Sequence, residues 1–109
     1  MMANYRASVK KYLPSLEWIK SLSEAKQSQY LKKSPSDLIK FLCDVLFNLS
    51  LGKFDVVPAV IAQLRPHKNL ISKICGKKRS LKARRNLIAR KGNFDTIFSP
   101  LIESLIELL

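Results

Sequence analysis

The stretch from Ser34 to Gly52 constrains the fold most, because its apolar residues recur with the period of an α-helix. Ser34 is placed as an N-cap, Pro35 suits the first position of a helix, and Gly52 suits the C-terminal cap. One side of this helix carries the apolar residues Leu38, Phe41, Leu42, Val45, Leu46 and Leu49. The opposite side carries Asp37, Lys40, Asp44 and Asn48. We therefore predict a central core helix over about 35–50.

Shorter apolar patterns on both sides of the central helix predict further helices. We expect the first over 14–23, with Pro14 in its first turn, and the second over 25–33 with Ala25, Tyr30 and Leu31 facing inward. Later helices are expected at 58–64, 66–75 and 80–91, with Ser80 as the N-cap of the third, and a last one from about Pro100. The inward residues of the 58–64 helix should be Val60, Ile61 and Leu64.

No window shows the alternation of apolar and polar residues that is typical of strands. We expect an all-α fold, a single compact bundle of about five to seven short helices with a basic helical hairpin and an apolar C-terminal helix. Residues 1–92 should form the helical domain, and residues 93–109 an amphipathic, acidic and apolar tail.

The charge of the chain is concentrated in one block. The net charge is +12, from 20 Lys+Arg and 8 Asp+Glu. Residues 65–92 contain no acidic residue. The charged residues of 93–109 are all acidic, namely Asp95, Glu103 and Glu107. The basic residues of the block are Arg65, Lys68, Lys73, Lys77, Lys78, Arg79, Lys82, Arg84, Arg85, Arg90 and Lys91.

Cations placed so close together repel one another unless a polyanion relieves the repulsion. Double-stranded DNA offers one phosphate charge per ~1.7 Å of axis and releases counterions when a protein neutralises it. We therefore expect nucleic acid as the partner of the block, with DNA favoured over RNA. Two alternatives stay open, namely a solvated helix face and a nuclear-import signal alone.

Residues 66–75, 76–79 and 80–91 have the layout of a helix-turn-helix. On the predicted 80–91 helix, however, Arg84 and Lys91 fall on the side of the apolar Leu87 and Ile88, so the cations surround the helix. This distribution favours phosphate contacts without sequence preference. No aromatic residue interleaves the block, so single-strand stacking is not indicated by the sequence.

Chemical catalysis has little support. The single histidine, His67, lacks partners for a metal or acyl-transfer site, and there is no Gly-rich phosphate loop. Cys43 and Cys75 lie 32 positions apart and form no CxxC pair, so a structural zinc site is not supported. Both fall in apolar helical patterns, so we expect free, buried thiols, with a disulfide between them as the open alternative. We expect a non-enzymatic protein without cofactor or metal. Neither a signal peptide nor an apolar stretch of the ~20 residues that span a bilayer is present, so we expect an intracellular protein.

The tail allows three interpretations. It could pack on the domain, dock in the groove of a protein partner, or lie on a membrane surface, although its acidic polar side disfavours the membrane. Its acidic residues could also shield part of the basic block until DNA displaces them. The partner-binding residues would be Phe94, Phe98, Leu101, Ile102, Leu105, Ile106 and Leu109.

Two segments together resemble a known group of proteins. The first is Ser34-Pro35-Ser36-Asp37-Leu38-Ile39 with Phe41-Leu42-Cys43 and a following glycine. The second runs from Lys77-Lys78-Arg79-Ser80 to Arg84-Arg85-Asn86-Leu87-Ile88, then Lys91-Gly92, Phe94 and Ser99-Pro100-Leu101-Ile102. In order and spacing they are similar to the small basic proteins of Maverick/Polinton elements and adintoviruses, over roughly residues 15–109.

The resemblance implies an accessory or minor virion protein of a virus-like element, analogous to the polybasic core peptides with which adenoviruses condense their genomes. It implies a location in the nucleus, the virion or both. The leading hypothesis is a DNA-condensing protein that contacts phosphates. The alternative is a protein-interaction or capsid-associated module that works through the tail, and a third hypothesis makes the tail a membrane-active entry peptide.

Overall fold

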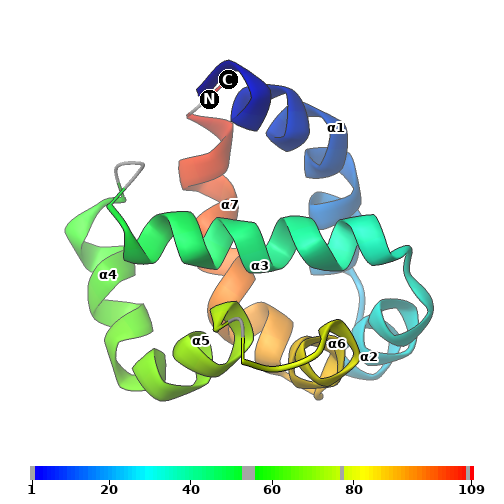
Figure 1. Cartoon of the computed structure of the whole chain (residues 1–109). Coiled ribbons are helices and arrows are strands. Elements are labelled where there is room, and N and C mark those ends of the chain that lie inside the picture. The colour runs from blue at the N-terminus through cyan, green and yellow to red at the C-terminus, as the bar shows by residue number, and fades with distance from the viewer. Residues whose placement is uncertain (1, 53–55, 77, 108) are drawn as a thin grey trace.

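The protein folds into helices, as a computed structural model shows for residues 2–52, 56–76, 78–107 and 109, with side chains from Arg6 onward (Figure 1). No strand occurs in these ranges. The helices are α1 (Met2–Ser21), α2 (Glu24–Lys33), α3 (Ser36–Ser50), α4 (Pro58–Leu64), α5 (Lys68–Cys75), α6 (Leu81–Ala89) and α7 (Ser99–Ile106). A 3₁₀ turn, η1 (Arg65–His67), links α4 to α5, and a π-helical turn, η2 (Phe94–Phe98), leads into α7. The all-α prediction is confirmed.

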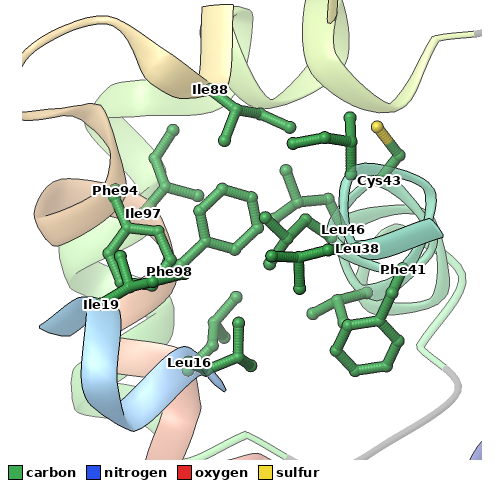
Figure 2. Packing of buried hydrophobic residues seen from close by; sticks show 14 of the residues in the cluster. Leu16, Ile19, Leu38, Phe41, Cys43, Leu46, Ile88, Phe94, Ile97 and Phe98 are labelled. Carbon is green, nitrogen blue, oxygen red and sulfur yellow. The ribbon is translucent and has the colours of Figure 1, made fainter. Parts of the chain in front are cut away.

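Helix α3 crosses the middle of the molecule, and the other helices lie around it (Figure 1). The radius of gyration is 12.8 Å, close to the ~13 Å expected for a compact domain of this length. The predicted apolar side of α3 is in the core: Leu38, Phe41, Leu42, Val45 and Leu46 are buried. Figure 2 shows Leu38 and Leu46 of α3 facing Leu16 and Ile19 of α1 and the aromatic rings of η2.

Helix α1 is longer than the sequence pattern indicated. It begins by Met2 rather than at residue 14, so Pro14 lies inside the helix. Proline cannot donate the hydrogen bond that the carbonyl of Lys10 would accept. Both residues are exposed, so water can reach that carbonyl, and the prediction of a helix start at Pro14 was wrong.

Serine 34 does not cap α3 as predicted. Helix α3 begins at Ser36 after Pro35 and has no side-chain cap. The hydroxyl of Ser34 instead donates a 3.0 Å hydrogen bond to the carbonyl of Leu31, at the end of α2. Ser80, in contrast, caps α6 as predicted, because its hydroxyl accepts a 3.1 Å hydrogen bond from the amide of Ala83.

Two predicted inward residues point outward, and one buried polar residue was missed. Ala25 is exposed, and Ile61 is 43% exposed. Gln27 is buried, and hydrogen bonds satisfy its amide nitrogen. This nitrogen donates to the carbonyl of Ile19 at 3.0 Å and to a carboxylate oxygen of Asp95 at 2.8 Å. These bonds satisfy the end of α1 and tie it to η2, which apolar periodicity cannot reveal.

The C-terminal segment completes the core and is not an appendage. Gly92 adopts a left-handed conformation (φ 87°) that turns the chain, and a helical path begins at Phe94 instead of near Pro100. The predicted boundary after residue 92 therefore corresponds to a turn within one core. The buried apolar residues of this segment are Phe94, Ile97, Phe98, Leu101, Ile102 and Leu105.

Candidate nucleic-acid interface

The turn between α5 and α6 presents a group of cations on a short, constrained connection. Gly76 ends α5, and its amide donates a 2.9 Å hydrogen bond to the carbonyl of Ser72. A Cβ atom at residue 76 would lie 2.8 Å from that same carbonyl oxygen, so only glycine fits without a shift of the backbone. Four residues later, Ser80 caps α6. Both ends of the connection are thus fixed by the sequence.

We define the turn surface as Lys73, Lys78, Arg79 and Lys82, which are all exposed. Lys73, Lys78 and Arg79 line a shallow hollow of about 600 Å³ together with Ser72 and Gly76. The arrangement suits phosphate groups. Lys77, predicted as a contact residue, lies outside the described residues.

The other exposed cations of the block form two separate groups. Arg65 begins η1 and Lys68 begins α5, and both border an apolar groove of about 400 Å³ between α3, α4 and α5. Arg90 and Lys91 follow the end of α6 and are exposed. The fold therefore divides the 65–92 block into three groups, of which the turn surface is the largest.

Arg85 has a structural role within the bundle. Its Nη1 donates hydrogen bonds to the carbonyls of Leu31 at 2.9 Å and Ser34 at 2.6 Å, and to the Ser34 hydroxyl at 3.2 Å. Its Nη2 donates to the Ser36 hydroxyl at 3.4 Å. The guanidinium thus holds α6 against the corner between α2 and α3. It is not available for the phosphate contact that the sequence suggested.

Arg84 is also half-buried, with its Nε atom enclosed and unpartnered. It lies beside Cys43 of α3. Burial raises the pKa of the Cys43 thiol above the ordinary value of 9.0, and the nearby Arg84 opposes part of this rise. Burial likewise raises the pKa of Cys75. Both cysteines are free, and the raised pKa values disfavour the reactive thiolate at neutral pH.

The acidic tail does not neutralise the block. Asp95 accepts hydrogen bonds from Gln27 and from the hydroxyl of Ser99 (3.1 Å), so it is engaged in the core. Glu103 and Glu107 are exposed on α7. Within the described part of the chain, no lysine or arginine lies at ion-pair distance from a carboxylate. The predicted shielding is therefore not present in this conformation.

Helix α6 is a poor recognition helix for a DNA groove. It packs against α2, α3 and α5, and within Leu81–Ala89 only Lys82 and Asn86 are exposed. A recognition helix needs a protruding side that carries several base contacts. This geometry disfavours base contacts through α6.

The residues predicted to bind a partner through the tail are mostly unavailable. Phe94, Phe98, Leu101, Ile102 and Leu105 are buried in the core. Only Ile106 (40%) and Leu109 (58%) remain exposed. In the structure the tail packs on the domain, which is one of its three interpretations. No helix among the described residues is long and apolar enough to cross a membrane.

Two lysines outside the block were missed by sequence reasoning. Lys32 and Lys33 end α2 and are exposed. They follow Leu31, whose carbonyl binds Arg85, so the fold brings them beside α6. Lys32 and Lys33 are distant from the block in sequence, and no local pattern indicates that they lie beside α6.

The described residues contain no candidate metal site. They contain no group of three or more His, Cys, Asp or Glu that could hold a metal ion. His67, in η1, is half-buried.

Comparison with known proteins finds no relative, since no family model, curated protein or solved structure matches the chain.

Proposed function

We propose that this protein is a non-enzymatic nucleic-acid-binding protein that contacts backbone phosphates through the turn surface. The observation that carries the proposal is the group of exposed cations Lys73, Lys78, Arg79 and Lys82, which have no carboxylate partner among the described residues. If these cations were paired with carboxylates, those ion pairs would have to break before phosphate could bind. The absence of such pairs among the described residues removes that cost.

The shape of the turn surface supports contact with phosphate. Lys73, Lys78 and Arg79 border one hollow, so several donors can converge on one phosphate or on two neighbouring ones. Affinity should then depend steeply on salt, because bound phosphates release counterions. The ligand is DNA in our proposal, and the resemblance to proteins of Maverick/Polinton elements and adintoviruses favours condensation of a genome in a nucleus or virion.

The test is a titration of duplex DNA at several salt concentrations. The triple variant Lys78→Ala, Arg79→Ala, Lys82→Ala is compared with a control, Arg6→Ala, Lys10→Ala, Lys20→Ala, which removes the same charge from exposed residues of α1. The turn variant should flatten the log–log salt slope by about 2–3, that is about 0.9 per lost phosphate contact. The control should keep a slope near that of the wild type.

Two results would refute the proposal. One is a wild-type protein that does not bind duplex DNA at low salt. The other is an equal loss of affinity in the turn variant and the α1 control, because binding would then follow the net charge alone.

A further inference from the structure

An aromatic pair lies where α1 meets α2. The rings of Trp18 and Tyr30 meet edge to face, with centroids 4.7 Å apart and an interplanar angle of 77°. In this geometry one ring touches the other only with its edge, so the faces of that ring are not covered by the pair. Trp18 is 50% exposed, whereas the rings of the Phe94–Phe98 pair are both buried. The pair therefore offers an open aromatic surface that the core does not use.

Helical position explains why Trp18 faces outward. Its neighbours Leu16 and Ile19 are buried, and Trp18 lies off their side of α1. Tyr30 of α2 is half-buried and packs against the hydrophobic core. The two rings are thus held by rigid elements and not by a loop, so their orientation is set before any ligand arrives.

Cations flank the aromatic pair. Lys26 precedes Tyr30 by four residues and Lys33 follows it by three, so both lie on the same side of α2 as the tyrosine. Both are exposed, and neither has a carboxylate partner in the part of the chain that the structure describes. An aromatic surface between cations is what proteins present to single-stranded nucleic acid, whose bases stack while its phosphates bind lysines.

We propose that Trp18 and Tyr30 form a stacking platform for an unpaired base of single-stranded nucleic acid, with Lys26 and Lys33 contacting the flanking phosphates. The platform rests on the proposed function for its ligand class and adds the form of nucleic acid that is bound. The basic block itself contains no aromatic residue, but the fold supplies this pair from outside it.

The platform adjoins α6, the helix that carries Lys82 of the turn surface. Leu31 directly follows Tyr30, and its carbonyl accepts the 2.9 Å hydrogen bond from Arg85 of α6. Helices α2 and α6 pack side by side, as Figure 1 also shows. One strand of nucleic acid can therefore reach from the platform along α2 and α6 toward Lys82.

Intrinsic fluorescence tests the platform directly, because Trp18 is the only tryptophan of the chain. The probes are a 12-nucleotide oligo(dT), a duplex of the same length, and inorganic polyphosphate, which has charge but no bases. Oligo(dT) should quench the emission of Trp18. The duplex and polyphosphate should bind while leaving the emission unchanged, because neither offers an unpaired base.

Two variants make the test quantitative. Trp18→Leu should weaken oligo(dT) binding about 5- to 150-fold, the effect of losing one stacked base, and should leave duplex affinity unchanged. The double variant Lys26→Ala, Lys33→Ala keeps the aromatic pair and changes only exposed residues, so it should fold normally. It should flatten the salt slope for oligo(dT) by about 1.4, whereas Arg6→Ala, Lys10→Ala should not.

The outcomes separate this inference from the proposed function. Binding of oligo(dT) without quenching overturns the platform, and so does a Lys26, Lys33 variant with an unchanged slope for oligo(dT). If the duplex binds through the turn surface but oligo(dT) does not quench, the platform alone is lost. If the wild type binds neither DNA, both proposals are lost.

Discussion

Arg85 of α6 donates a 2.6 Å hydrogen bond to the carbonyl of Ser34, which lies 51 residues earlier in the chain. This bond joins the most basic segment of the sequence to the corner between α2 and α3. The cations of the block therefore differ in role: Arg85 stabilises the fold, whereas the residues of the turn surface form no ion pair with a carboxylate of the described residues.

Removing Arg85 should destabilise the fold. Arg85→Ala leaves the carbonyls of Leu31 and Ser34 without their partner in a partly buried corner, and we expect a loss of about 2–3 kcal/mol in the free energy of unfolding. Urea denaturation measures it. The control Arg90→Ala removes an exposed charge and should stay within about 0.5 kcal/mol of the wild type. Equal stability of the two variants would contradict the role of Arg85.

Alanine at either of two glycines should lower the free energy of unfolding, but for different reasons. Gly76→Ala brings a Cβ atom to 2.8 Å from the Ser72 carbonyl oxygen and should cost about 1–3 kcal/mol while displacing the turn surface. Gly52→Ala meets no atom within 4 Å but strains a backbone at φ +67°, at a cost of about 1–2 kcal/mol.

DNA titration of the two glycine variants then separates stability from binding. Only Gly76→Ala should weaken duplex binding, because Gly52 ends α3 and is not part of the turn surface. An unchanged affinity in Gly76→Ala would show that the geometry of the turn does not matter for binding.

The C-terminal segment should be essential for folding. Removal of residues 93–109 exposes the core sides of α1 and α3, and we expect the remaining chain to lose its cooperative thermal transition. The milder change Leu101→Ala should cost about 2–5 kcal/mol, because Leu101 is fully buried. Circular dichroism during heating measures both. A shortened chain that still melts cooperatively would establish an independent 1–92 domain.

The two thiols should react slowly and in a fixed order. Burial raises both pKa values above 9.0, so alkylation of the half-buried Cys75 should accelerate as the pH rises through and beyond 9. Cys43 is buried and should react only when the protein opens. The raised pKa values also add stability that is present below pH 9 and lost above it. Mass spectrometry of timed samples resolves the order, and faster labelling of Cys43 would contradict it.

The sequence predicted what depends on local patterns. The apolar side of α3 and the Ser80 cap follow from periodicity and from the hydroxyl of serine, and both are found in the structure. Pro14 was misinterpreted because proline is more common at helix starts than inside helices, and the local pattern does not show that the carbonyl it leaves free is solvated.

The remaining features depend on residues that are distant in sequence. Gln27 meets Asp95 across 68 residues, and Trp18 meets Tyr30 across a helix corner. Such contacts are set by the packing of whole helices, so no local pattern identifies which arginine turns inward or which aromatic ring stays exposed. The charge of the block was evident from the sequence, but its division into three groups was not.

Backbone NMR of the ¹⁵N-labelled protein during addition of a short duplex tests the central claim most directly. Our account predicts that the largest shifts of amide signals occur at residues 72–82, around the turn surface, and that residues 6–20 of α1 change little. The largest shifts in α1, or shifts spread evenly over all basic residues, would contradict the claim that the turn surface binds nucleic acid.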